Sequence, residues 1–439
     1  MTGDPRIGAQ LRVNGTAPAG DDVHVDLMGR QSFRMVLHAG TASEITEDDR
    51  GHAHNTRRSQ QEPTIPARGT STDGRRRRVL VAVGSTAGHV YPALAIADAY
   101  REMFPDLDVR FAGPFDRLAA RVLAARGHVL EPVSASQLVN VGLGGKITAA
   151  GRVVMGMTQA RRLLRHHGTR LVLGLGGYAT GAILLAARTL GLRIAIHEAN
   201  VVPGLANRLL APFAHRIYLG FSATAPAFAN RHQVVTGHPV RAEIAALTSA
   251  RRLAPERERP ARVLVLSSTR GERFFADRMP DLLAGIERRG VPVEVLHQAG
   301  KIAIDDVADG YRRAGVKAMV TPYLDHIADA YRWADLVVAR SGAGTIAEIA
   351  AAGVPALLVP LADASGDHQA PNADAVAATG GAIVVREAGW QCDPLAAQVA
   401  ALLGNAAWTT AAAAARRLAR PEAAARIVAD CEALMTDRW

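Results

Sequence analysis

The chain has 439 residues, 49% of them hydrophobic and 21% charged, so it is long enough for two domains with sizeable cores. Its formal net charge is +10, but no aromatic residues are interleaved with the basic ones, which argues against nucleic-acid binding and leaves a basic patch for phosphates or acidic headgroups open. No apolar run reaches the roughly 18 residues of a membrane span, and no secretory signal is evident. The two cysteines, Cys392 and Cys431, are too few for a disulfide scaffold and fit a reducing cytoplasm.

Residues 1–77 differ in composition from the rest of the chain. They are rich in Gly, Asp, Arg, Thr and Ser, show little periodicity and end in a run of arginines. This composition predicts a disordered extension. Two alternatives stay open: a start codon assigned upstream of Met28 or Met35, and a short functional arm.

From residue 78 onward, short β-branched runs alternate with helical segments, which predicts parallel sheets with right-handed crossovers. The pattern restarts after a polar, Arg-rich segment, so we expect an α/β fold with two Rossmann-like domains facing a cleft, at 78–240 and 241–420, and a final helix at 421–439 packing back across them. The predicted strands are 79–83, 108–113, 128–133, 170–175, 193–198, 261–268, 292–300, 317–324, 334–342, 355–360 and 381–387, and the last helical stretch is 408–436.

In such folds ligands bind beyond the carboxyl ends of the strands, and the first candidate loop is "GSTAGH" at 84–89. Its small residues allow close approach to a helix N-terminus, which favours an anion. The loop lacks the third glycine of a dinucleotide fingerprint and the Gly-Lys-Ser/Thr of a P-loop. His89 is either a structural or capping histidine, or a general base that works near neutral pH.

Two further loops follow strands in the first half. The segment "LGLGGYATG" is either a tight glycine turn or a binding loop. After the strand "RIAIHE", the trio His197, Glu198 and Asn200 precedes a Pro-Gly turn. A polar trio at a strand end predicts side chains that face a ligand rather than a core.

The fourth loop is "RSGAGTIAEIAAAGVPALLVP" at 340–360. The amides around Gly342 and Gly344 and the hydroxyl of Thr345 can hold a phosphate at the helix N-terminus. Glu348 lies one turn further on and can accept hydrogen bonds from a pair of sugar hydroxyls. The alternative for Thr345 and Glu348 is a capping box, since T-x-x-E is its signature.

Seven motifs together resemble the MurG family, the UDP-GlcNAc:N-acetylmuramyl-(pentapeptide)-pyrophosphoryl-undecaprenol transferases of peptidoglycan synthesis. They are "GSTAGHVYPALAIA", "GLGGYATG", "HEANVVPGLAN", "GHPVR", "HQAGK", "RSGAGTIAEIAAAGVPALLVP" and "DHQAPNA", in family order and spacing over about residues 78–425. The resemblance implies a GT-B fold and an inverting hexosyl transfer from a UDP-sugar, with GlcNAc as the expected sugar, to a lipid I-type hydroxyl acceptor. It implies no cofactor and no metal.

The same resemblance assigns roles to residues. His89 corresponds to the family's general base, and Glu348 and Thr345 to the contacts with ribose and the α-phosphate. The acceptor side is expected at Ser85, Thr86, Tyr178, Glu198 and Asn200. The donor side is expected at Arg241, Thr269, Arg270, Ser341, Gly344, Thr345, Glu348, His368 and Gln369.

The chain departs from the family pattern in three loops. It has "GSTAGH" for the usual "GGTGGH", "HEAN" for "HEQN" and "SSTRGE" at 267–272 for "GGSQGA". Side chains in the last loop narrow the space for backbone approach, while Arg270 offers a new contact to phosphate or a carboxylate. The alternative function is therefore a MurG-like enzyme of a secondary-metabolite pathway with another donor or acceptor.

The resemblance also implies a cytoplasmic protein in peripheral contact with an anionic membrane, at the inner face of the cell membrane. Segment 144–167 combines apolar residues with arginines and histidines, as interfacial helices do, although an ordinary amphipathic helix covering the sheet has the same pattern. Two other classes remain as remote alternatives. One is a nicotinamide-dependent oxidoreductase, and the other is a non-catalytic protein that binds a nucleotide-sugar.

Overall fold

The computed structural model describes residues 22–26, 32–36, 78–84, 86–134, 143–177, 180–250, 252–256, 258–267, 273–361 and 368–436. The chain divides into two compact units, Met1–Thr72 and Asp73–Trp439. In the first, β1 (Asp22–Asp26) and β2 (Ser32–Val36) form an antiparallel pair. The rest of the expected N-terminal extension lies outside the described residues.

The N-terminal half of the second unit has a seven-stranded parallel sheet in the order β5-β4-β3-β6-β7-β8-β9. Its central strand β3 is buried on both sides, since Val79 and Val81 enter one core while Leu80 and Ala82 enter another. The strands are β3 (Arg78–Ala82), β4 (Asp108–Gly113), β5 (Leu130–Pro132), β6 (Thr169–Gly174), β7 (Arg193–Glu198), β8 (Arg216–Leu219) and β9 (Gln233–Val235).

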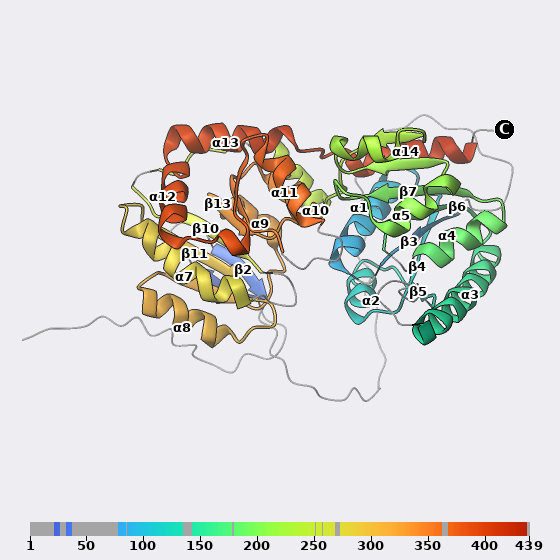
Figure 1. The fold of residues 1–439 in the computed structure, drawn as a ribbon, viewed down its shortest axis with the longest axis horizontal. Coiled ribbons are helices and arrows are strands. Elements are labelled where there is room, and N and C mark those ends of the chain that lie inside the picture. Colours follow the sequence, from blue (N-terminus) through green and yellow to red (C-terminus); the bar gives the residue numbers. More distant parts are fainter. Residues whose placement is uncertain are drawn as a thin grey trace, which may run out of the picture. The chain divides into compact units, whose positions relative to one another are not determined.

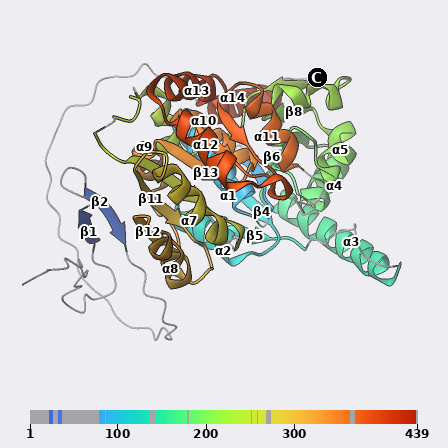
Figure 2. The ribbon, with the colours of Figure 1, turned by 60° about the vertical axis from the view of Figure 1, so that its left-hand side comes forward.

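Helices cover both faces of this sheet. Figures 1 and 2 both show α3 lying beside α4, and Ala160 and Leu164 of α3 enter the core on that face. No helix in the described part of the chain is long and apolar enough to cross a membrane. The elements are α1 (Ala87–Met103), α2 (Arg117–Ala124), α3 (Leu143–His166), α4 (Thr180–Thr189), α5 (Leu205–Leu210), the 3₁₀ turns η1 (Ala211–Phe213) and η2 (Ser222–Phe228), α6 (Ala242–Ala245) and η3 (Ala246–Ser249).

The C-terminal half has a six-stranded parallel sheet in the order β12-β11-β10-β13-β14-β15. Figure 1 shows α7 and α8 side by side next to this sheet. Its strands are β10 (Ala261–Leu266), β11 (Val293–Gln298), β12 (Ala318–Thr321), β13 (Leu336–Ala339), β14 (Ala356–Leu358) and β15 (Ala382–Val384). Its helices are α7 (Arg273–Glu287), α8 (Ile304–Ala314), α9 (Ile327–Trp333), α10 (Ala343–Ala352), α11 (Gln369–Ala377), η4 (Glu387–Gly389), α12 (Cys392–Leu402) and α13 (Asn405–Arg417).

Both sheets follow the strand order 3-2-1-4-5-6 of a Rossmann fold, with one additional edge strand in the first. The order reverses between β3 and β6 in one sheet and between β10 and β13 in the other. Ligands of open α/β sheets bind where the order reverses. The loops after β3, β6, β10 and β13 therefore occupy the positions at which a binding site is expected.

The end of the chain differs from the predicted single helical stretch at 408–436. It forms α13 and then α14 (Ala423–Thr436), and the break contains Pro421, which has no N–H to donate. Ile427 and Val428 of α14 enter the core of the N-terminal half. The polypeptide thus crosses from the second sheet back to the first.

Candidate active site

The imidazole of His89 lies among glycines at the start of α1. A Cβ atom placed on Gly84 would lie 2.5 Å from its Nδ1, and one on Gly177 would lie 3.4 Å from its Cε1. Nδ1 is 2.9 Å from the Oγ1 atom of Thr86. Burial lowers the pKa of His89 to about 4, so the ring is neutral at pH 7, the form that accepts a proton, but it is a weaker base than the near-neutral imidazole expected from the sequence.

The glycine turn after β6 is both a tight turn and a neighbour of His89. Gly176 and Gly177 have φ values of 92° and 85°, a left-handed conformation that favours glycine. A Cβ atom on Gly176 would lie 3.7 Å from the Nε2 atom of His89. Two loops that are far apart in the sequence therefore flank one imidazole.

The trio at the end of β7 is arranged differently from the expectation that it faces a ligand. His197 and Glu198 are 1% and 2% exposed. The carboxylate of Glu198 accepts hydrogen bonds from the backbone N of Asn200 (2.9 Å), the N of Gly204 (3.0 Å) and the Nδ2 of Asn207 (2.8 Å). Glu198 thus holds the loop that carries Asn200, because its oxygens are occupied by donors of its own loop.

Asn200 lies where the two halves contact each other. Its Oδ1 accepts a hydrogen bond from the Nδ2 of Asn372 in α11 at 3.0 Å, and the Oδ1 of Asn372 accepts one from the N of Val201 at 2.9 Å. Asn372 is fully buried and also donates to the carbonyl of Ser341 at 3.2 Å. Asn372 was missed as a site residue, although it belongs to the motif "DHQAPNA".

The loop after β13 leads into α10, whose N-cap residue is Gly342 without a side-chain cap. The capping-box alternative for Thr345 and Glu348 is wrong, because Thr345 is the third residue inside the helix. Gly344 and Thr345 are half-buried in the first turn. The first backbone N–H groups of a helix have no partner within it, so this end can bind an anion.

The carboxylate of Glu348 is bound on both oxygens. Oε1 accepts from Nη2 of Arg241 at 3.2 Å, and Oε2 accepts from the hydroxyl of Tyr331 at 3.0 Å. Burial raises the pKa of Glu348, while the charge of Arg241 and the hydrogen bond from Tyr331 oppose that shift. The guanidinium of Arg241 also lies 4.4 Å from the ring centre of Tyr91, two residues after His89.

The remaining donor-side residues gather at the start of α11. The Oε1 atom of Gln369 accepts from the N of Ser341 (3.3 Å) and the N of Leu361 (3.1 Å), which leaves its amide nitrogen for another partner. Ser341 is fully buried and donates its hydroxyl to the carbonyl of Gln369 at 2.8 Å. His368 lies beside them and its Nδ1 is 3.2 Å from the carbonyl oxygen of Val202 in the first half.

Four predicted site residues, Ser85, Tyr178, Thr269 and Arg270, lie outside the described residues. Within the described part of the chain, no three His, Cys, Asp or Glu side chains form a group that could hold a metal ion. The structure adds Asn372, Tyr331 and His238 to the neighbourhood of the predicted residues. Nothing in the sequence pattern pointed to Tyr331.

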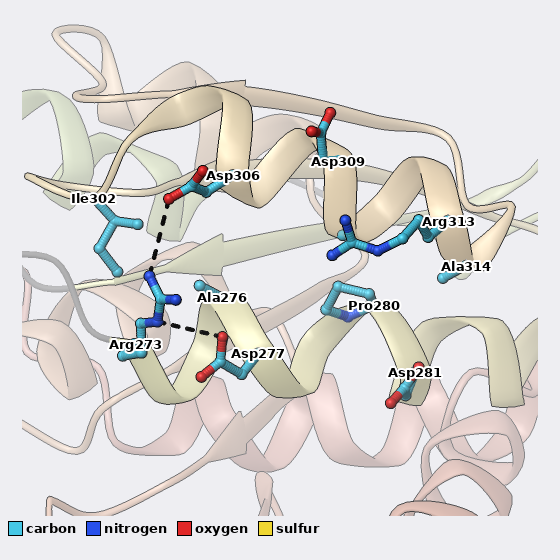
Figure 3. A pocket seen from close by; sticks show the side chains of 11 residues that line it. Arg273, Ala276, Asp277, Pro280, Asp281, Ile302, Asp306, Asp309, Arg313 and Ala314 are labelled. Atoms are coloured by element: carbon cyan, nitrogen blue, oxygen red, sulfur yellow. Dashed lines mark ion pairs between the residues drawn. The ribbon is translucent and has the colours of Figure 1, made fainter.

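A separate groove of about 520 Å³ lies between α7 and α8 (Figure 3). Its walls carry mainly charged side chains, and Arg273 pairs across it with Asp306 at 4.0 Å and along α7 with Asp277 at 3.6 Å. Gly310 approaches Pro280 closely there. None of the predicted site residues lines this groove.

Two Rossmann-like halves, each with a glycine-rich loop where its strand order reverses, have the architecture of GT-B enzymes. Family comparisons agree: residues 79–219 match the glycosyltransferase family 28 N-terminal domain and residues 262–427 match its C-terminal domain. The protein is therefore a hexosyltransferase, and the predicted GT-B fold is confirmed.

Individual relatives show which glycosyltransferases this chain is similar to. A UDP-N-acetylglucosamine--N-acetylmuramyl-(pentapeptide) pyrophosphoryl-undecaprenol N-acetylglucosamine transferase of Magnetococcus marinus is 36% identical over 80% of this chain and 96% of its own length. The enzyme of the same name from Halorhodospira halophila is 40% identical over 81% of this chain and 98% of its own length. The crystal structure of Acinetobacter baumannii MurG superposes with a TM-score of 0.66 at 27% identity, covering 81% of this chain and 99% of that one. The chain belongs to the MurG family.

Proposed function

We propose that this enzyme transfers N-acetylglucosamine from UDP-GlcNAc to a hydroxyl of a lipid I-type acceptor, with inversion and without a metal ion. The relatives in the family carry this donor and this lipid-linked acceptor in their names. The observation that carries the proposal is that an imidazole, His89, and an uncapped helix N-terminus, at Gly342, each follow the strand at which the order of their sheet reverses.

His89 acts as the general base. Since its Nδ1 lies against the hydroxyl of Thr86, Nε2 is the nitrogen that takes the acceptor's proton. The acceptor oxygen forms a bond to the anomeric carbon as the bond from that carbon to the phosphate oxygen breaks. The face of the sugar that is attacked is opposite to the leaving group, so the configuration inverts.

The leaving UDP carries the negative charge. The N-terminus of α10, with Gly344 and Thr345 in its first turn, stabilises that charge. Glu348 accepts hydrogen bonds from the ribose hydroxyls, and the free amide nitrogen of Gln369 contacts the sugar. Arg241 is released from Glu348 when the ribose binds and neutralises the diphosphate.

The substitution at Ser267 gives no support to a different donor. Its side chain is 3% exposed and its hydroxyl lies 3.1 Å from the Nε2 of His297, so it is directed into the protein interior. The remainder of "SSTRGE" lies outside the described residues. The described residues therefore offer no support for the secondary-metabolite alternative.

A transfer assay tests the function directly. The purified enzyme is incubated with a water-soluble lipid I analogue and UDP-GlcNAc, UDP-GalNAc or UDP-Glc, and products are identified by mass spectrometry and NMR. We expect a β-linked GlcNAc product that forms equally well in EDTA. The proposal would be contradicted if the enzyme transferred sugar from UDP-Glc but not from UDP-GlcNAc, or if it lost activity in EDTA. His232→Ala, at an exposed histidine before β9, is the control for His89→Ala.

We also propose that α3 binds an anionic membrane surface. Its inner face buries Ala160 and Leu164, whereas Val154 and Met155 are 59% and 47% exposed. Arg152, Arg162 and Arg165 of α3 are exposed as well. Val154→Asp should reduce sedimentation with phosphatidylglycerol vesicles, while Leu253→Asp, at an exposed leucine before β10, should not. Equal sedimentation of both variants would refute the assignment.

A further inference from the structure

His238 is a buried histidine without a hydrogen-bond partner. It lies between β9 and α6, is 6% exposed, and neither its Nδ1 nor its Nε2 has a partner. Leaving a buried polar group unpaired is unfavourable, and most such groups in folded proteins are satisfied. His297 is also buried, but both of its ring nitrogens have partners: the hydroxyl of Ser267 lies 3.1 Å from Nε2 and the hydroxyl of Tyr311 lies 3.0 Å from Nδ1.

The ring of His238 is held firmly although its nitrogens are free. It packs against the ring of His197 with centroids 5.2 Å apart, and His197 is in turn anchored at 3.3 Å to the carbonyl oxygen of Gly237. Gly237 has a φ of 87°, and a Cβ atom there would lie 2.4 Å from the Cβ of Arg420. The backbone before His238 therefore has little freedom to redirect the ring.

The Nε2 atom of His238 points at the start of α10. A Cβ atom placed on Gly344 would lie 3.4 Å from it. Gly344 is in the first turn of this ten-residue helix, whose N-cap has no side-chain hydrogen bond. Unpaired backbone N–H groups and an unpaired imidazole thus meet at one place, and an anion with several acceptor oxygens would satisfy both.

We propose that His238 binds the diphosphate of the donor, donating a hydrogen bond from Nε2 to a phosphate oxygen at the N-terminus of α10. This inference rests on the proposed UDP-sugar donor and adds a residue to its diphosphate site. A hydrogen bond to a charged acceptor is among the stronger ones in proteins. Glycine at 344 is suited to the role because a side chain there would come between the ring and the helix N-terminus.

The test compares two probes that differ only in the diphosphate. Dissociation constants for UDP and uridine are measured by calorimetry on the full chain for wild type, His238→Leu and His238→Gln. His128→Leu is the matched control, since the Nε2 of His128 is also buried and unpaired but packs against Phe111 in the first half. We expect His238→Leu to weaken UDP binding by roughly 10- to 100-fold and uridine binding by less than about threefold. His238→Gln, which restores a donor near the position of Nε2, should recover most of the loss.

The other possible results of the binding experiment separate the role of His238 from the proposed function. Equal losses for UDP and uridine, or no loss for either, would overturn the assignment while leaving the proposed function in place. If wild type bound neither probe, the donor class would be wrong and the assignment of His238 with it. Should His238→Leu fail to fold, His238→Gln and His238→Asn decide. The His238→Gln variant must then bind UDP more tightly than His238→Asn, because only the longer glutamine side chain places its amide near the position of Nε2.

Discussion

Tyr331 offers a sharp test of the role of Glu348, because its hydroxyl can be removed with little change in shape. Tyr331 is fully buried and donates to Oε2 of Glu348 at 3.0 Å, while Arg241 occupies Oε1. A hydrogen bond to a charged acceptor contributes about 1.5–3 kcal/mol. Losing it in Tyr331→Phe should destabilise the carboxylate form and raise the pKa of Glu348 further.

The assay follows UDP binding from pH 8 down to pH 4. If Glu348 binds the ribose as a carboxylate, affinity is lost as the pH falls through its pKa, so a higher pKa moves that loss to higher pH. Tyr311→Phe is the matched control, because Tyr311 is equally buried and its hydroxyl lies 3.0 Å from Nδ1 of His297. Both variants should lower the free energy of unfolding, by about 1–3 kcal/mol, but only Tyr331→Phe should shift the acidic limb of the binding curve.

Coinciding acidic limbs for Tyr331→Phe and Tyr311→Phe would refute this reasoning. Glu348 would then be a structural acid whose hydrogen bonds stabilise the fold without affecting the nucleotide. Urea unfolding of both variants separates the two cases, because it measures the loss of stability independently of binding.

Three further predictions follow from the site and the core. His89→Ala should lower kcat by roughly 10²- to 10⁴-fold with the Kd for UDP nearly unchanged, and unaltered turnover would remove His89 from the mechanism. Burial lowers the pKa of His197 and of His297 to about 4, below an unfolded value of about 6.5. The unfolded state then binds more protons between these values, so urea unfolding should show stability falling by about 1.4 kcal/mol per pH unit for each histidine as the pH drops from 6.5 to 4, and a flat profile would contradict this. In α3, a Cβ on Gly156 would lie 2.0 Å from a backbone oxygen, so Gly156→Ala should lower the melting temperature, whereas Gly151→Ala, with nothing within 4 Å, should not.

The sheets could be predicted from the sequence because each strand and its following helix leave a local pattern. β4 and β7 begin and end where the sequence predicted. β8 and β9 were missed because neither is followed directly by an α-helix: the 3₁₀ turn η2 follows β8, and a loop from Thr236 to Arg241 follows β9. The glycine loops at the ends of β3 and β13 were found for the same local reason, since small residues between a strand and a helix are visible in one short window.

The contacts that complete the site could not be predicted, because they join residues far apart in the sequence. Asn372 bonds to Asn200 across 172 positions, and Arg241 to Glu348 across 107. The T-x-x-E spacing at Thr345 fits a capping box, yet the helix begins at Ala343, before Thr345. The residue at which a helix begins cannot be read from this spacing alone. Similarly, a polar residue at a strand end can face either solvent or its own loop, and Glu198 does the latter.

Arg241 connects the two halves of the proposed mechanism. Its guanidinium contacts Glu348 of α10 and stacks on Tyr91 of α1, the helix that carries His89. A nucleotide whose ribose occupies Glu348 has to replace the hydrogen bond from Arg241, and the guanidinium, which stays charged, must then find another acceptor. In the proposed mechanism the diphosphate is the anion that arrives with the ribose, so filling the ribose site would direct Arg241 to the phosphates. Because Arg241 rests on Tyr91, the side chain that the proposed donor would displace from Glu348 also contacts the helix that carries His89.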